Sequence, residues 1–131
     1  MLIKEQESPF DFEKTIDLLI EAINNKEGWK VTALIDQNQA VMENGGTSIG
    51  KFKIIKYCNG KHASQMLQSD DRKYIGTMMP KSFAVYEKSD GQSYVSFLNG
   101  AVMGDMMGGE IEAIINEVSF DVSEMISVLK K

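Results

Sequence analysis

Cysteine and histidine are nearly absent from this sequence, which has only Cys58 and His62 of these types among its 131 residues. A single cysteine cannot form an intrachain disulfide, so the chain is not a small secreted scaffold held together by disulfides. No apolar run approaches the roughly 20 residues of a membrane-spanning helix, and the opening MLIKEQESPF lacks the apolar segment of a signal peptide. We therefore expect a cytoplasmic protein with no membrane partner.

Motifs of common nucleotide-binding and metal-dependent enzymes are missing as well. The sequence has no G-x-G-x-x-G, no complete P-loop and no H-E-x-x-H. A basic surface is also missing, because 14 basic and 19 acidic side chains give a net charge of −5. Such a chain repels phosphate backbones unless its cations are concentrated in one patch. Lys51, Lys53 and Lys56 instead alternate with apolar residues along a predicted strand. We expect no nucleic-acid partner.

What the sequence does contain is typical of one globular domain spanning residues 1–131. Apolar residues make up 43% and charged residues 25% of the chain, which argues against disorder. Phe12, Ile16, Leu19 and Ile23 recur on one helical face, with Ser8 or Asp11 as alternative N-caps and Gly28 at the end. A second, longer apolar stripe predicts a C-terminal helix over residues 111–129.

The remaining periodic segments predict strands. Residues 2–7, 29–35 and 51–58 form three of them, and the third is apolar on both faces and therefore central in the sheet. Residues 83–87 and 94–98 flank Asp90-Gly91, a strong hairpin signal. Asp36 and Gln39 predict a short helical turn, Asn59 caps another short helix, and residues 99–109 form a glycine- and methionine-rich loop. The predicted fold is α+β, an antiparallel sheet with helices packed on one face in β-α-β4-α order.

One local cluster has the residue types of a reactive or metal-binding site. If a strand ends at Cys58 and Asn59 caps the next helix, the thiol lies at the positive end of the helix dipole. That position favours the thiolate, which is the form that reacts or binds a metal, and His62 in the first turn would serve as base or second ligand. The competing interpretation is a packed structural thiol beside a surface histidine.

Methionine is the second unusual feature, with nine in the chain. Thioethers suit Cu(I), so methionines near Cys58 and His62 would make a copper site. Methionine also lines adaptable apolar pockets or simply fills gaps in a core. We take as candidate ligand-binding residues those of the cysteine cluster, the two clusters of methionines and one strand tyrosine: Cys58, Asn59, His62, Met79, Tyr86, Met103, Met106 and Met107. Cys58 and His62 are the candidate metal ligands, joined by methionines in the copper alternative, and the sequence does not identify a cofactor.

The ordered motifs of the chain resemble a known family. Cys58-Asn59, the segment Ile75-Gly76-Thr77-Met78-Met79-Pro80, Val85-Tyr86-Glu87, Asp90-Gly91 and Tyr94-Val95-Ser96 are similar to the domain of unknown function numbered 302. The resemblance covers essentially the whole chain. It implies a β-α-β4-α unit of the TATA-binding-protein-like class that pairs as a homodimer, and it implies no activity and no DNA binding.

Two positions depart from that family's pattern. Relatives commonly have proline after Cys-Asn, where this chain has Gly60, and many have cysteine after Met-Pro, where this chain has Lys81. The second departure weakens the case for a two-cysteine site. We therefore expect a non-catalytic accessory or binding protein, homodimeric, with an apolar ligand pocket near the methionine-rich loop. The alternatives are a thiol-dependent enzyme or a copper binder that uses Cys58 and His62, or a structural module that only binds partners.

Overall fold

Five antiparallel strands form one sheet in the order β1-β5-β4-β3-β2. The computed structural model describes residues 1–130. The strands are β1 (Ile3–Ser8), β2 (Trp29–Asp36), β3 (Phe52–Asn59), β4 (Lys81–Glu87) and β5 (Ser93–Leu98). The helices are α1 (Phe12–Asn25), α2 (Gln37–Glu43), α3 (Gly60–Leu67), α4 (Gly100–Met107) and α5 (Gly109–Ile126), with 3-10 segments η1 (Asp70–Met78) and η2 (Ser127–Leu129). The predicted α+β class is confirmed.

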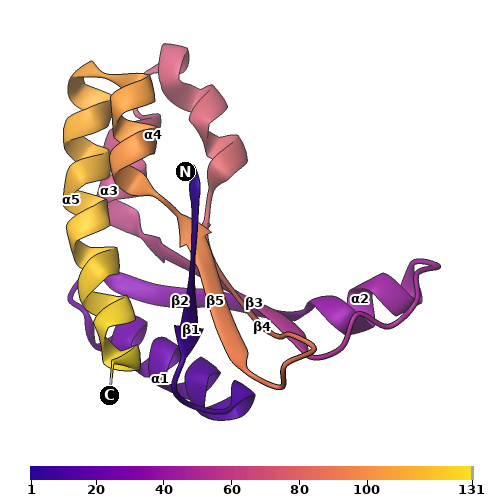
Figure 1. Ribbon diagram of the computed structural model, residues 1–131. Helices are drawn as coiled ribbons and strands as arrows, with labels where there is room; N and C mark the ends of the chain where they lie inside the picture. The colour runs from indigo at the N-terminus through magenta and orange to yellow at the C-terminus, as the bar shows by residue number, and fades with distance from the viewer. Residues whose placement is uncertain (131) are drawn as a thin grey trace.

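The helices gather on one side of the sheet. Figure 1 shows α1 and α5 beside the sheet, α4 alongside α5, and α2 projecting away on the far side. Side chains alternate between the two faces of a strand, so one face of each inner strand supplies the core and the other points away from the helices. The core combines one face of the sheet with α1 and the end of α5: Phe12, Ile16, Leu19, Ile23, Trp29, Ile55, Tyr57, Phe83, Val85, Val95, Val122, Met125, Ile126 and Leu129.

The start and end of α1 follow from local chemistry. Asp11 is the N-cap, because its Oδ1 accepts a hydrogen bond from the Lys14 amide at 2.7 Å. Ser8, the alternative cap, is buried instead and lies 2.6 Å from the Thr15 hydroxyl. After the helix, Gly28 has φ +85°, and a Cβ there would lie 2.9 Å from the Asn59 amide nitrogen. Glycine at this position therefore lets the chain enter β2 against the end of β3.

The predicted strand pairings are confirmed where the sequence signals were strongest. β3 lies between β2 and β4, as expected for a strand that is apolar on both faces. β4 and β5 form the hairpin, and Gly91 in its turn has φ +79°. Asp36 caps α2 by accepting a hydrogen bond from the Gln39 amide at 3.0 Å. No helix within residues 1–130 is both long and apolar enough to cross a membrane.

The prediction of a loop over residues 99–109 is wrong, because most of this segment is the helix α4. Asn99 caps it, and its side chain accepts a hydrogen bond from the Val102 amide. The glycines that suggested a loop serve close packing against α5. A Cβ at Gly100 would lie 1.6 Å from the Ser119 hydroxyl, and one at Gly104 would lie 3.3 Å from the Glu112 side chain. The glycines of this segment therefore provide room for a neighbouring helix rather than flexibility.

Candidate functional site

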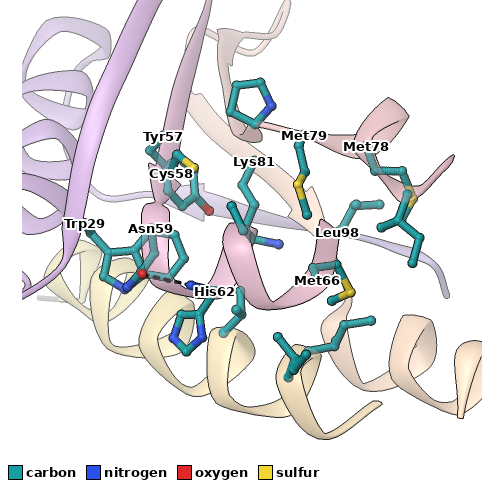
Figure 2. A pocket seen from close by; sticks show the side chains of 16 residues that line it. Trp29, Tyr57, Cys58, Asn59, His62, Met66, Met78, Met79, Lys81 and Leu98 are labelled. Atoms are coloured by element: carbon teal, nitrogen blue, oxygen red, sulfur yellow. Dashed lines mark hydrogen bonds between the residues drawn. The ribbon is translucent and has the colours of Figure 1, made fainter. Parts of the chain in front are cut away.

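An apolar pocket lies where the ends of β3 and β4 meet α3, η1 and the first half of α5. Its volume is about 100 Å³. Figure 2 shows the side chains that surround it. Most of the lining is aliphatic, aromatic or thioether: Trp29, Tyr57, Cys58, Asn59, His62, Ala63, Met66, Ile75, Met78, Met79, Pro80, Lys81, Leu98, Ile114, Ile115 and Val118. Concave apolar sites with a few polar groups are typical of small-ligand binding.

Register brings two polar side chains of this pocket together. Tyr57 of β3 and Lys81 of β4 are directly opposite each other in the antiparallel ladder. Residues paired in this way point to the same face of a sheet and lie in contact distance. Tyr57 is fully buried, so both side chains project toward the helices. The Tyr57 ring stacks on Phe83 at 4.8 Å between centroids and tilts against Trp29 at 5.6 Å, which fixes the direction of its hydroxyl.

The Tyr57 hydroxyl has no hydrogen-bond partner among residues 1–130, although it is buried. Burial raises the pKa of Tyr57, so the group remains a neutral phenol. A buried hydroxyl without a partner is unfavourable, because it has lost its hydrogen bonds to water. Exceptions of this kind in native proteins call for an explanation, and an occupant of the pocket is one.

The Lys81 amine is also partly removed from water without a charged partner. Its side chain is half-buried, and desolvation lowers its pKa from the ordinary value of 10.5. Within the described part of the chain, no carboxylate pairs with it and none of the residues that line the pocket is acidic. The protein itself therefore supplies no carboxylate to pair with the Lys81 amine in this pocket.

Asn59 and His62 close the pocket at the start of α3. The Asn59 side chain caps this helix, as predicted, accepting hydrogen bonds from the amides of Lys61 at 3.0 Å and His62 at 3.2 Å. The His62 ring lies 6.2 Å from Trp29 between centroids. Its buried Nδ1 is 3.7 Å from a carboxylate oxygen of Glu117, beyond hydrogen-bond distance, and has no other partner in residues 1–130.

Cys58 and His62 do not form the reactive pair that their spacing suggested. Tyr57 and Asn59 face the helices, so Cys58 between them points to the opposite face of β3. Figure 2 shows its sulfur directed away from His62, and no hydrogen bond joins the two side chains in the part of the chain that the structure covers. Nor do residues 1–130 contain any group of three or more His, Cys, Asp or Glu side chains that could hold a metal ion.

The other predicted residues lie in three places. Met79 lines the pocket, together with Met66 and Met78. Met103 lines a neighbouring hollow that shares Tyr57, Met79 and Lys81 with it. Met106, with 68% of its surface exposed, and Met107 lie on α4 and are not among the residues that line the pocket. Tyr86 lies on the face of the sheet away from the helices, where its hydroxyl bonds to Glu5.

The two residues that give the pocket its polarity are not among the residues predicted from the sequence. Tyr57 appeared only as part of an apolar strand, and Lys81 only as a departure from the family pattern. A local signal for Lys81 was available, because it is a lysine two residues before the apolar run of a predicted strand and directly after Met79-Pro80. No local signal pairs Tyr57 with Lys81, since their contact depends on strand register across 24 residues of chain, from 57 to 81.

One enzyme-like pattern in the chain is accounted for by its context. Gly46-Thr47-Ser48-Ile49-Gly50 fits G-x-S-x-G, the form of a hydrolase nucleophile turn between a strand and a helix. Here the segment connects α2 to β3, the reverse order, and it is exposed. The Ser48 hydroxyl lies 3.3 Å from the Asn38 side chain. The pattern therefore forms an ordinary loop.

An α+β protein with an apolar pocket at one end of its sheet is the class that these observations define. The sequence matches the family described as domain of unknown function DUF302 over residues 4–129, and the chain belongs to this family. A crystal structure of an uncharacterized conserved DUF302 protein from Bacillus stearothermophilus has a similar fold, with a TM-score of 0.83, 18% identity and 99% of each chain covered. No curated protein matches the sequence.

Proposed function

We propose that this chain is a small cytoplasmic binding protein that takes a small, mainly apolar molecule into the pocket between β3, β4, α3 and α5. The observation that carries this proposal is the buried Tyr57 hydroxyl, which has no partner among residues 1–130 and lies in an apolar cavity. A ligand that accepts a hydrogen bond would restore the interaction that the hydroxyl loses on folding. The apolar lining would supply the rest of the affinity.

The size of the cavity limits the ligand. An engineered apolar cavity of roughly 150 Å³ is known to bind benzene, so a cavity of about 100 Å³ suits the apolar end of a molecule with about the width of one ring or a short alkyl chain. Larger ligands would extend out of the pocket. Methionine side chains at Met66, Met78 and Met79 would adapt to the shape of the occupant, because thioether chains are flexible and polarisable.

Toluene binding tests this proposal. The chain has one tryptophan, Trp29, and it lines the pocket, so its fluorescence reports occupancy. We expect saturable quenching or enhancement by toluene and a rise in melting temperature, since a ligand that binds only the folded state stabilises it. Ala63→Leu, which fills the pocket, should abolish the fluorescence change. The control is Ala113→Leu. Ala113 lies on the exposed side of α5, so this change should leave the fluorescence response to toluene intact. Unchanged toluene binding in Ala63→Leu would place the ligand elsewhere.

We also propose that the protein acts as a homodimer. The face of the sheet away from the helices carries a row of aromatic rings, in which Phe52 stacks on Tyr86 at 5.0 Å and Tyr86 on Tyr94 at 6.4 Å between centroids. Beside it, α2 has no buried residue, and Met42 and Ile49 each have 47% of their surface exposed. Partly exposed aromatic rings near exposed apolar side chains are typical of protein interfaces. A second copy, with its own exposed α2 and open sheet face, offers a matching apolar surface.

Sedimentation equilibrium tests the dimer. We expect twice the chain mass at micromolar concentration, and a particle of 14.6 kDa would contradict the proposal. Ile49→Glu should give the monomer, because it places a charge on the proposed interface. The matched control is Phe120→Glu, a change at a residue of α5 with 63% of its surface exposed, which should leave the dimer intact.

A further inference from the structure

We propose that the ligand of this pocket carries an anionic head, of the carboxylate class, held between the Lys81 ammonium and the Tyr57 hydroxyl. This inference rests on the proposed function, since it concerns the polar end of a molecule whose apolar part fills the same pocket. It assigns these two side chains to recognition of the ligand. It also names the chemistry that distinguishes this ligand from a purely apolar one.

The charge of the lining selects the sign of the head group. Of the 16 residues drawn around the pocket, Lys81 is the one lysine or arginine, and none of them is Asp or Glu. The nearest carboxylate to the lining histidine belongs to Glu117, which lies outside the lining and is 68% exposed. An ammonium removed from water without a counter-ion is unfavourable, and an anion that enters with the ligand compensates it. A cationic head would meet the same ammonium and be repelled.

The geometry supplies two donors aimed at one place. Tyr57 and Lys81 are cross-strand partners on the face of the sheet that the helices cover. Figure 2 shows the Lys81 side chain extending toward Met66 and Leu98, with the Tyr57 hydroxyl beside the Lys81 stem. A phenol donates one hydrogen bond and an ammonium up to three, while a carboxylate has two acceptor oxygens. One carboxylate oxygen can therefore accept a hydrogen bond from the hydroxyl and the other from the ammonium. Hydrogen bonds that involve charged groups are stronger than those between neutral groups.

Surroundings that exclude water strengthen this recognition. The Tyr57 ring is held between Trp29 and Phe83, so its hydroxyl does not have to be ordered when the ligand binds. Side chains of α5 line the pocket with Ile114, Ile115 and Val118, which contribute no competing acceptor. A small apolar body with one carboxylate, such as an aromatic acid or a short fatty acid, matches both the lining and the donors.

Three ring compounds of nearly equal shape test the inference: benzoate, benzamide and benzamidine, which differ in bearing a negative, neutral or positive head. We expect calorimetry to rank their affinities in that order. Lys81→Met should weaken benzoate about 10- to 100-fold and change benzamide by less than about threefold, because one charge-assisted contact is lost. Lys30→Met is the control, since Lys30 is exposed on β2, donates to the Asn24 carbonyl oxygen at 3.2 Å and does not line the pocket or the neighbouring hollow. It should leave benzoate binding unchanged.

Tyr57→Phe provides a second, independent variant, which should weaken benzoate with the fold intact. Equal affinities of the wild-type protein for the three compounds, or equal loss of all three in Lys81→Met, would overturn the anionic head and leave the apolar pocket standing. Binding of toluene without binding of benzoate would do the same. Failure of toluene and of all three compounds would instead overturn the proposed function, and this inference with it.

Discussion

The two halves of α5 face different parts of the molecule, although one apolar stripe runs through both. Toward its C-terminal end, Val122, Met125 and Ile126 are buried against the sheet and α1. Toward its N-terminal end, Ile114 and Val118 stay partly exposed and line the pocket. The two halves differ in their packing partners. The C-terminal half packs against α1, a full amphipathic helix, whereas the N-terminal half faces short α3 and the 3-10 segment η1. The same stripe closes a core in one place and borders a cavity in the other.

The largest effect should come from shortening a side chain in the packed half. Met125 has 1% of its surface exposed, so Met125→Ala removes buried contacts and leaves a cavity, and we expect a loss of about 2 to 5 kcal/mol in the free energy of unfolding. Ile114→Ala adjoins an existing cavity and should lose less than about 2 kcal/mol. Urea denaturation of the two variants measures the contrast. Equal losses would mean that the pocket end is packed as tightly as the core.

A smaller and opposite effect is expected from the pocket half. Tyr57→Phe removes a buried hydroxyl that has no partner in residues 1–130, so the ligand-free variant should be more stable by about 1 to 3 kcal/mol. The matched control is Tyr94→Phe, whose hydroxyl bonds to Asp90 at the surface and whose loss should change stability by less than about 0.5 kcal/mol. A destabilised Tyr57→Phe would reveal a partner for the hydroxyl and remove the argument for a ligand.

The charge at Lys81 predicts a pH dependence. Burial lowers its pKa below 10.5, so between the lowered and the ordinary value the unfolded chain binds a proton that the folded chain has released. Stability rises with pH where the unfolded state binds more protons. Lys81→Met should therefore be more stable than the wild type below the lowered pKa, and this advantage should shrink as the pH approaches 10.5. Urea midpoints of both proteins across this pH range measure the difference in stability. A difference that widens with pH would contradict the assigned burial of Lys81.

The smallest effect concerns an ion pair that ties η1 to α5 at the pocket end. Arg72 lies 2.9 Å from the Glu110 carboxylate, but the Glu110 side chain is 86% exposed. Glu110→Gln should therefore change stability by less than about 1 kcal/mol. Arg72→Met should do more, because Arg72 also donates to the carbonyl oxygens of Gln65 and Met66. Thermal melts of the two variants separate the ion pair from these backbone contacts, and equal effects would refute the distinction.

Much of the fold could be predicted because its signals are local. The spacing of Phe12, Ile16 and Leu19 predicts α1 without reference to any neighbour, and Asp90-Gly91 fixes the β4–β5 hairpin in the same way. The misread segment is the one whose glycines act at a distance. Gly100 and Gly104 make room for Ser119 and Glu112 of another helix, so their role depends on packing that no local pattern encodes.

The candidate site was predicted only in part, for a related reason. Asn59 as the cap of α3 depends on neighbouring amides, and the sequence was sufficient to assign it. Cys58 and His62 are close in sequence yet point apart. Strand alternation turns Cys58 to the face opposite Tyr57 and Asn59, whereas His62 lies on α3 over the helix-covered face. Met79 lines the pocket, whereas Met106 on α4 is exposed. The position of Met106 depends on where α4 packs and not on the methionine content of the segment.

The sequence by itself determined most of the secondary elements, with α4 as the main exception, and also the family, since these follow from periodicity, caps, turn residues and ordered motifs along short stretches of chain. Only the tertiary structure decided where the pocket lies and which polar groups it holds. Register placed Tyr57 opposite Lys81, and packing of α3, η1 and α5 over them removed water from a hydroxyl and partly from an ammonium. Burial of a polar group is a property of everything packed around it, so it appears only when distant segments meet.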